Sequence, residues 1–397
     1  MEQKALQFMR QRLDLVHSQH LYRQLRTVSA GAATWIEVEG HKVLNLSSNN
    51  YLGLATRPVL QAAASAAAQA DGWGAGSSRL IAGDSKRHKL LEARLASFKH
   101  AESALLFNSG YTANVGVISS LSQAGDLILS DELNHASIID GCRLSRAECK
   151  VFPHCNVAAL AELLAAAVQT GRQRTILVVT DTVFSMDGDL APLREIARLC
   201  TQYDALLVVD EAHATGCIGP AGRGLVAQLE IEYEAVVAIS TLSKALGSFG
   251  AFVTGPQLVK DYLINTARNF IFTTALPPPV IAASLAALDI LEQEPELVEQ
   301  LQTKATFFRQ GLQQLGFNTL TSQTHIIPIL IGDAALALEM AQQLLAQGVF
   351  AVAIRPPTVP PGTSRIRTSL MATHTQGDLH YALSTFEDVG RKFGIIG

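Results

Sequence analysis

Between about residue 100 and residue 255, short apolar runs alternate with segments of helical periodicity. The apolar runs are SALLFNSG, DLILSD, TILVVTD, ALLVVDEAH, AVVAIS and GAFVTG. Strands that are apolar on both faces and separated by helices are typical of a mainly parallel sheet covered by helices on both sides. The chain is 48% hydrophobic and 17% charged, so it has enough apolar residues for a large core. We therefore predict an α/β fold.

The segments on either side of this block predict two further parts. The first 45 residues contain a helical pattern and a short hairpin, TWIEVEGHKVLNL. After a long helical stretch over about Pro279–Leu315, strands alternate with helices again, and a proline-rich loop covers Pro356–Ser364. We predict an N-terminal segment (1–45), a large α/β domain (46–285) and a smaller α+β domain (286–397).

Charge, hydropathy and cysteine content exclude several classes of protein. The net charge is -4 and the isoelectric point is about 6.3, so a nucleic-acid binder with a basic surface is not expected. No apolar run reaches the length of a membrane span, and the N-terminus lacks the apolar core of a signal peptide. The five cysteines form no CxxC motif, which favours free thiols and no metal site. We expect a cytoplasmic protein without nucleic-acid or membrane partners.

Polar residues follow five of the predicted strands. In open α/β sheets, ligands bind beyond the carboxyl ends of the strands. Residues at five strand ends are therefore expected to form one shared site. The five segments are Ser109–Tyr111, Asp131–His135, Asp181–Ser185, Asp210–His213 and Ser240–Lys244.

Lys244, in STLSKALGSFG, follows one of these strands. It is either a lysine that extends to the surface or a nucleophilic lysine that forms a Schiff base, which requires a lowered pKa. Thr241, with the neighbouring serines, could donate hydrogen bonds to a phosphate. We interpret Gly247 and Gly250 as residues that leave space for a flat ligand.

Asp210 and His213, in LLVVDEAHATG, strengthen the second interpretation of Lys244. A carboxylate at the end of an apolar strand is costly without a partner, and a pyridinium nitrogen is such a partner. An aspartate there keeps the ring of pyridoxal phosphate protonated and makes it a better electron sink. His213 could reach the ring oxygen. Considered singly, Asp210 could be a helix-capping aspartate and His213 an ordinary loop histidine. The hypothesis of a pyridoxal-phosphate site therefore depends on the order in which the motifs occur.

Further candidate residues follow other strands. A helix that begins at Gly110 offers free N–H groups to a phosphate, although an ordinary strand–helix turn looks the same. His135 could stack on a planar ring or simply start a helix, and Ser185 offers a hydroxyl. Arg365 and Arg367 alternate with Ile366 and so share one strand face. One of them could bind a carboxylate, and a surface ion pair is the alternative.

Four motifs together resemble the α-oxoamine synthases. They are STLSKALGSFGAF, VVDEAHATGCIGPAGRG, SSNNYLGLA and GAGSSRLIAGD. The resemblance extends from about Arg23 to the last helix. It implies a fold-type I pyridoxal-phosphate transferase with a mainly parallel seven-stranded sheet, flanked by helices, and a smaller C-terminal domain. It also implies a homodimer with shared active sites, and enzymes that join an amino acid to an acyl thioester with loss of carbon dioxide.

The resemblance also implies a role for each candidate residue. Lys244 would carry the cofactor as a Schiff base, Asp210 would pair with the pyridine nitrogen, His213 with the ring oxygen, and His135 would stack on the ring. The other cofactor-binding positions are Gly110, Tyr111, Ser185 and Thr241, with Thr273 or Thr274 reaching the phosphate of the neighbouring subunit. The substrate-binding positions are Arg23, Asn49, His135, Thr358 and Arg367. Arg26 is an alternative to Arg23.

The substrates are implied by the segment AIRPPTVPPGTSRIR, with VFSMDGDLAPL in agreement. These segments are most similar to members that condense L-alanine with a pimeloyl thioester, carried by CoA or an acyl-carrier protein. Members that use glycine are one alternative, since FIFTTALPP is close to theirs. A fold-type I aminotransferase or decarboxylase, and a catalytically silent binding protein, are the others.

Overall fold

The computed structural model describes residues 4–169, 174–231 and 236–397. By their contacts, these residues form two units. Unit 1 comprises residues up to Ser48, Met186–Gly188 and Thr303–Gly397, and unit 2 comprises Asn49–Ser185 and Asp189–Gln302. Residues 286–302 thus group with unit 2, and the first 48 residues group with the C-terminal part. The division into domains at 45 and 285 stays a prediction about independently folding parts.

Unit 2 is built on a seven-stranded sheet with the order β4-β10-β9-β8-β7-β5-β6. The strand pairs from β9 to β6 are parallel, whereas β10 runs antiparallel to both β4 and β9. The α/β fold with a mainly parallel sheet is thereby confirmed. The strands are β4 (Ser103–Phe107), β5 (Leu127–Asp131), β6 (Glu148–Phe152), β7 (Ile176–Asp181), β8 (Leu206–Asp210), β9 (Val236–Thr241) and β10 (Ala251–Gly255).

The six apolar runs correspond to six of these strands. The first residue predicted for β9, Ala235, lies outside the described residues. Every residue of β4, β5, β7, β9 and β10 is buried, as expected for strands covered on both faces. The seventh strand, β6, lies at the edge, and its first four residues are exposed. Burial therefore explains why only β6 lacks an apolar run.

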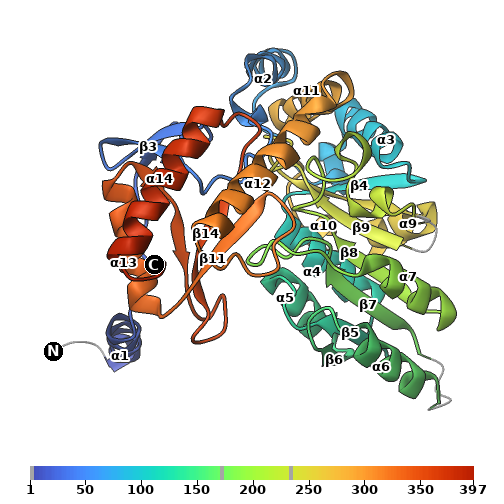
Figure 1. Ribbon diagram of the computed structural model, residues 1–397. Coiled ribbons are helices and arrows are strands. Elements are labelled where there is room, and N and C mark those ends of the chain that lie inside the picture. The colour runs from blue at the N-terminus through green and yellow to red at the C-terminus, as the bar shows by residue number, and fades with distance from the viewer. Residues whose placement is uncertain (1–3, 170–173, 232–235) are drawn as a thin grey trace. The chain divides into compact units, whose positions relative to one another are not determined.

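Helices cover the sheet on both faces (Figure 1). The core on one face contains residues of α4, α5, α9 and α10, and α3 and α7 contact strands as well. The helices of unit 2 are α2 (Pro58–Asp71), α3 (Lys86–Lys99), α4 (Gly110–Leu121), α5 (Ala136–Ser145), α6 (Val157–Gln169), α7 (Leu193–Gln202), α8 (Leu225–Gln228), α9 (Gln257–Thr266), α10 (Arg268–Ile271) and α11 (Pro278–Gln293), with short helical turns at Leu54–Thr56, Arg79–Gly83 and Pro220–Gly222.

The helical stretch predicted over about Pro279–Leu315 is confirmed, and the structure divides it into two helices. It is interrupted, and α11 is followed by a separate helix, α12 (Glu296–Gln314), which contains the boundary between the units at residue 302. Pro295 lies in the break. Proline lacks an N–H and disfavours a helical conformation of the preceding residue, here Glu294.

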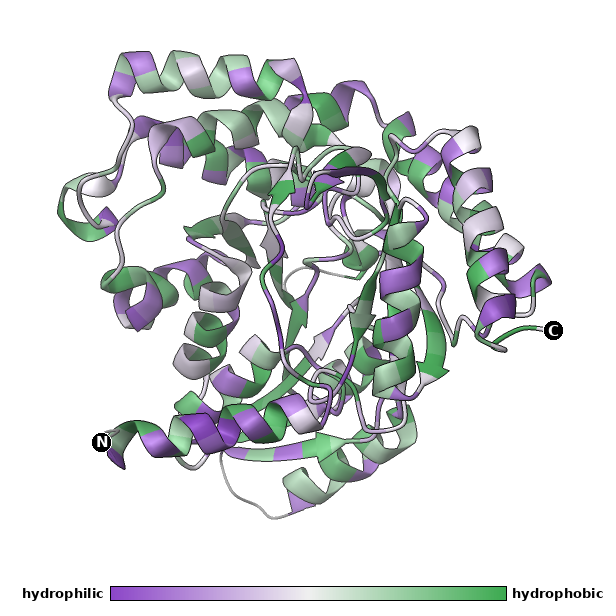
Figure 2. Ribbon diagram, turned by 90° about the vertical axis from the view of Figure 1, so that its left-hand side faces the viewer, coloured by the Kyte–Doolittle hydropathy of each residue, from purple (hydrophilic) through white to green (hydrophobic). Residues whose placement is uncertain are grey.

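Unit 1 contains two small sheets and the terminal helices. One sheet has the order β1-β2-β3-β12, and the other, β11-β14-β13, is antiparallel. No residue of α1 is buried, and hydrophilic and hydrophobic residues mix along it (Figure 2). The elements are α1 (Lys4–Ser18), β1 (Val28–Ser29), β2 (Trp35–Val38), β3 (His41–Asn45), β11 (Ile326–Gly332), α13 (Ala334–Ala346), β12 (Val349–Phe350), β13 (Val352–Ile354), β14 (Ser364–Ser369) and α14 (Gln376–Lys392).

The predicted hairpin TWIEVEGHKVLNL corresponds to β2 and β3, and the proline-rich loop connects β13 to β14. Among the described helices, none combines the length and the apolar character needed to cross a membrane.

Candidate active site

A pocket of about 210 Å³ lies at the carboxyl ends of the strands of unit 2. Residues from all five predicted segments line it, with Asp181 as the one contributor from Asp181–Ser185. The prediction that these strand ends share one site is therefore supported by the geometry. The lining residues are Gly110, Tyr111, Asn114, His135, Ser137, Asp181, Asp210, Ala212, His213, Thr241, Ser243 and Lys244.

The loop after β9 places Lys244 in the pocket as a half-buried side chain. The turn closes with a hydrogen bond from Gly247 N to Lys244 O (2.9 Å), and Thr241 Oγ1 donates to Gly250 O (2.9 Å). Gly247 has a φ of 62°, and a Cβ there would lie 2.3 Å from the backbone nitrogen of Ala55. The loop conformation thus depends on glycine at this position.

The interpretation of Gly247 and Gly250 as space for a ligand is wrong. A Cβ at Gly250, whose φ is 107°, would come within 3.0 Å of Leu276. Both glycines lie against protein rather than against the pocket, and they fix the turn that carries Lys244. Gly110 is the glycine whose Cβ would point into open space, since no atom lies within 4 Å of that position.

Asp210, the last residue of β8, is buried in the pocket. Its Oδ1 accepts a hydrogen bond from the backbone N–H of Ala212 (2.7 Å), and its Oδ2 accepts one from Asn114 Nδ2 (2.6 Å). Asp181 occupies the matching position at the end of β7. Burial, together with the negative charge of Asp210, raises the pKa of Asp181 well above its usual value.

Hydrogen bonds on two sides fix His135, which is the N-cap of α5. Its backbone N–H donates to Asp181 Oδ2 (2.7 Å), and its Nδ1 lies 2.6 Å from Ser137 Oγ. Asn114 Nδ2 donates to that same hydroxyl (2.9 Å), so Ser137 accepts from Asn114 and donates to His135. Desolvation lowers the pKa of His135, and the charge of Lys244 acts in the same direction.

His213 connects Lys244 to the start of unit 2. Its Nε2 lies 3.0 Å from Lys244 Nζ, and its Nδ1 lies 2.7 Å from the hydroxyl of Tyr51. That hydroxyl donates its proton to Asn49 Oδ1 (3.0 Å), so its oxygen accepts from Nδ1–H of His213. This leaves Nε2 of His213 as the acceptor that faces Lys244.

A buried ion pair supports the segment between Asp210 and His213. Lys99 Nζ lies 2.5 Å from Glu211 Oε2, and both side chains are completely buried. Lys99 also donates to Thr215 Oγ1 (2.9 Å), and Glu211 Oε1 accepts from the backbone N–H of Val226 (2.9 Å). Because each charge is compensated, the pair can hold this segment at the end of β8.

Comparisons with known proteins agree with this geometry. Residues 41–386 match the family described as aminotransferase class I and II. The chain is 49% identical to an 8-amino-7-oxononanoate synthase from Geobacter sulfurreducens, over 97% of this chain and 98% of the relative. The chain belongs to the α-oxoamine synthases of this family.

Two solved structures are also similar to this α-oxoamine synthase in fold and sequence. A serine palmitoyltransferase from S. paucimobilis with bound pyridoxal phosphate and myriocin superimposes with a TM-score of 0.90, at 32% identity and over 98% of each chain. An 8-amino-7-oxononanoate synthase from Francisella tularensis gives 0.77, at 28% identity, over 89% of this chain and 99% of the other. The chain therefore has the fold-type I architecture, and it is a pyridoxal-phosphate-dependent enzyme of the acyltransferase type.

The pocket of this α-oxoamine synthase has the donor set that pyridoxal phosphate requires. It combines an amine (Lys244), a buried carboxylate (Asp210) and an imidazole at its edge (His135). The N-terminus of α4, at Gly110, opens onto the pocket and presents free backbone N–H groups beside the hydroxyl of Thr241. In pyridoxal phosphate, the amine matches the aldehyde carbon, the carboxylate matches the pyridinium nitrogen, the imidazole matches the aromatic ring, and the N–H groups match the phosphate.

Four predicted residues of unit 2 lie outside the pocket lining. Asn49 is linked to the pocket through Tyr51 and His213, as described above. Ser185 follows β7 but does not line the pocket. Thr273 and Thr274 line a separate, shallower hollow with Leu80, Ile81 and Phe272. That position agrees with the expectation that they serve a neighbouring subunit, which stays a prediction.

The remaining predicted substrate-binding residues belong to unit 1. Arg23 Nη2 lies 3.5 Å from Thr358 Oγ1, so two residues that are far apart in sequence lie together. Arg367 and Arg365 are buried on β14. Arg365 forms an ion pair with Asp187, whereas Arg367 donates to Ser369 Oγ (2.8 Å). Arg365 is thereby neutralised, and the role of Arg367 in binding a substrate carboxylate stays a prediction.

Sequence reasoning missed Tyr51, Asn114 and Ser137 as parts of the site, and it named Asp181 only as the start of one of the five strand-end segments. Tyr51 and Asn114 contact His213 and Asp210 through hydrogen bonds between segments distant in sequence, whereas Ser137 contacts His135, two residues before it. Asn114 is one helical turn beyond Gly110, so the two residues share a face of α4. Helical periodicity from Gly110 could therefore have predicted that Asn114 belongs to the site. For Tyr51 no local pattern exists.

Proposed function

We propose that the protein catalyses the decarboxylative condensation of L-alanine with pimeloyl-CoA or a pimeloyl acyl-carrier protein. The products are 8-amino-7-oxononanoate, the free thiol carrier and carbon dioxide, and the reaction belongs to biotin biosynthesis. The 49% identity over nearly the whole length to a protein named 8-amino-7-oxononanoate synthase is the observation that carries this proposal. The five cysteines, all free thiols, agree with a cytoplasmic location.

In this reaction Lys244 acts as the carrier of the cofactor and then as the general base. Bound pyridoxal phosphate supplies an electron sink for chemistry at the α-carbon of an amino acid. Lys244 Nζ removes the proton from the α-carbon of alanine, which requires the neutral amine. The Nε2 lone pair of His213, 3.0 Å away, accepts a hydrogen bond from that amine and orients it.

The other residues hold the reactants. Asp210, whose two oxygens accept hydrogen bonds from Ala212 and Asn114, would hold a proton on the pyridine nitrogen of the bound cofactor. His135, which lines the pocket, would stack on the ring of the bound cofactor and limit the access of water to it. Arg367 binds the carboxylate of alanine until carbon dioxide leaves, and Arg23, Asn49 and Thr358 contact the acyl substrate.

A substrate panel tests the proposal. Alanine, glycine and serine are each combined with pimeloyl, acetyl and succinyl thioesters, and thiol release and product mass are measured. We expect alanine with pimeloyl-CoA or pimeloyl acyl-carrier protein to react fastest. Glycine should be slower by about 10- to 100-fold, because one missing methyl group removes a contact of this size.

Other outcomes of the panel identify the alternatives. A preference for glycine with acetyl or succinyl thioesters would assign the enzyme to the glycine-using members. A preference for serine would agree with the likeness to serine palmitoyltransferase. If no pair releases thiol, but the amino acids are converted to their keto acids once a 2-oxo acid is added as amino acceptor, the protein is an aminotransferase.

We also propose that the enzyme is a homodimer and that Thr273 or Thr274 binds the phosphate in the partner's site. Leu80, Ile81 and Phe272 form an apolar surface beside these threonines, and Ile81 and Phe272 are 82% and 71% exposed. Large exposed apolar side chains beside polar ones are typical of protein interfaces. Thr273 and Thr274 do not line the pocket of their own chain. If the partner is a second copy of the chain, these threonines can reach the phosphate bound in that partner's pocket.

The double variant Ile81→Asp with Phe272→Asp is therefore expected to be a monomer. Sedimentation should show the wild type at twice the chain mass of 42.5 kDa and the variant at that mass, with cofactor affinity lowered at least tenfold. Leu258→Asp is the control, because Leu258 is equally exposed but lies on α9 outside this surface. A wild type that sediments as a monomer would contradict the dimer.

A further inference from the structure

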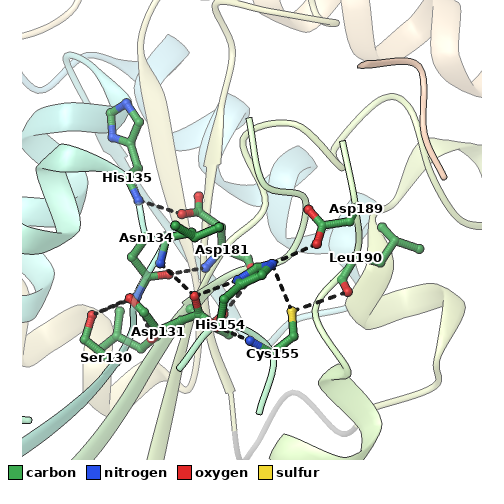
Figure 3. A network of polar contacts seen from close by, with 12 residues as sticks. Ser130, Asp131, Asn134, His135, His154, Cys155, Asp181, Asp189 and Leu190 are labelled. Atoms are coloured by element: carbon green, nitrogen blue, oxygen red, sulfur yellow. Dashed lines mark hydrogen bonds and ion pairs between the residues drawn. The ribbon is translucent and has the colours of Figure 1, made fainter. Parts of the chain in front are cut away.

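A polar network that the proposed reaction does not use lies next to the candidate active site. At its centre His154, which follows β6, lies between two carboxylates (Figure 3). His154 Nδ1 is 2.9 Å from Asp131 Oδ1, and Nε2 is 2.8 Å from Asp189 Oδ2. A ring that bridges two carboxylates through both nitrogens has to carry both protons, and it is therefore a cation.

The surroundings favour the charged ring. Asp131 and Asp189 are buried, and Oδ1 of Asp189 has no hydrogen-bond partner among the described residues. The negative charge of Asp189 is therefore balanced by His154. Burial by itself would lower the pKa of His154, but the hydrogen bonds to Asp131 and Asp189 raise it to about 12. The other groups that face the ring are the thiol of Cys155, 3.5 Å from Nε2, and the edge-on ring of Phe184.

The network continues from Asp131 to His135. Asp131 ends β5, and its carboxylate accepts from the backbone N–H groups of Leu133 (2.9 Å) and Cys155 (2.8 Å). Asn134 Nδ2 donates to the carbonyl of Val179 on β7 (2.8 Å), and its Oδ1 accepts from the N–H of Asp181 (2.9 Å). Asp181 in turn accepts from the N–H of His135. The turn at residues 131–135, which ends in His135, is thus held from both sides (Figure 3).

We propose that His154 is a positioning residue: as an imidazolium that joins Asp131 to Asp189, it fixes the turn at residues 131–135 and thereby the orientation of the His135 ring. The inference rests on the role proposed above for His135. Without the bridge, two buried carboxylates would lose their compensating charge, and the end of β5 would shift away from the segment that follows β7.

A metal ion is a weaker explanation for the same residues. Ligand atoms of Asp131, His154 and Cys155 lie within 4.8 Å of one another. A metal would have to displace a proton from a ring whose two nitrogens are both paired with carboxylates. Metal analysis of the purified holoenzyme checks this point, and a stoichiometric transition metal would overturn the proposal.

The protonation of His154 can be observed directly. In holoenzyme labelled with ¹⁵N-histidine, both ring nitrogens of His154 should be protonated at pH 8.5, where an ordinary histidine is neutral. The signal is assigned by its loss in His154→Gln. A neutral His154 ring at this pH would overturn the proposal.

The positioning role is tested with a double-mutant cycle. The readout is the induced circular dichroism of the bound cofactor, which reports how its ring is held, and activity is not needed. His135→Asn, which keeps an N-cap residue, and His154→Gln are each expected to lower the signal at least twofold. The double variant should match His135→Asn alone, because His154 acts through His135.

Additive losses in the double variant would contradict the role of His154 alone. If His135→Asn leaves the signal unchanged, the role proposed for His135 fails instead. Cys155→Ala is the matched control, since it removes an uncharged neighbour of the His154 ring and should keep the wild-type signal. Should His154→Gln fail to fold, Asp189→Ala removes the acceptor at the other end of the bridge, and a wild-type signal in that variant would overturn the proposal.

Stability gives an independent measurement. Because the pKa of His154 is raised on folding, its contribution is complete below pH 6.5 and declines as the pH rises toward 12. The difference in unfolding free energy between the wild type and His154→Gln should therefore be largest below pH 6.5 and shrink steadily above it. A difference that is independent of pH would contradict a charged ring.

Discussion

Replacing Lys244 with alanine is expected to lower turnover by about 10⁴-fold and to abolish covalent attachment of the cofactor. Lys244 is the one amine among the described residues that line the pocket, so no other side chain there can form the Schiff base. Borohydride reduction of the wild type followed by peptide mapping locates the attached cofactor. The label should appear on the peptide that contains Lys244.

Lys89→Ala is the matched control for this variant. Lys89 is exposed and pairs with Asp84 on the surface, so its removal should leave both the label and turnover at wild-type levels. A label on any other lysine in the wild type, or turnover above about one hundredth in Lys244→Ala, would show that the assignment of Lys244 is wrong.

The second large effect is expected for Asp210→Asn. The variant keeps an acceptor for Ala212 N–H and the volume of the side chain, so cofactor binding should be partly retained. The neutral amide cannot hold a proton on the pyridine nitrogen, so the ring becomes a poor electron sink. Exchange of the α-hydrogen of alanine with D₂O, followed by NMR without any thioester, should slow by about 10³-fold.

Asp181→Asn provides the comparison. Asp181 ends the neighbouring strand and is also buried, but burial and the charge of Asp210 raise its pKa, so an uncharged amide resembles its preferred form. Its loss of exchange should be much smaller than that of Asp210→Asn. Equal losses in the two variants would mean that Asp210 acts as one of several buried polar groups rather than through its charge.

Patterns within one segment predicted most of the sheet and the centre of the site. Buried parallel strands are apolar throughout, so β4, β5, β7, β8, β9 and β10 were visible in the sequence, and the polar residues that follow them marked the pocket. The edge strand β6, ECKVF, has exposed side chains and therefore no apolar run. His154 lies two residues after β6, and it was not predicted as a site residue because the sequence showed no strand there.

Contacts between distant segments could not be predicted in this way. The hydroxyl of Tyr51 contacts His213, which is 162 residues away in sequence, and Asn114 contacts Asp210 across 96 residues. Such pairs depend on how strands are ordered in the sheet, which periodicity does not specify. The glycines after Lys244 show a related difficulty, because their need for a positive φ is invisible until the turn is known.

The pairing of β4 with β10 affects the order in which the sheet can form during synthesis of the chain. In the sheet β4 has β10 as its neighbour, and Leu106 pairs with Phe252, so the pair forms only after nearly the whole of unit 2 has been synthesised. Until then the apolar β4 has no partner strand, a condition that favours aggregation during folding. Lys244 emerges from the ribosome just before β10. Closure of the sheet and completion of the site around Lys244 are therefore expected to be late steps of folding that occur together.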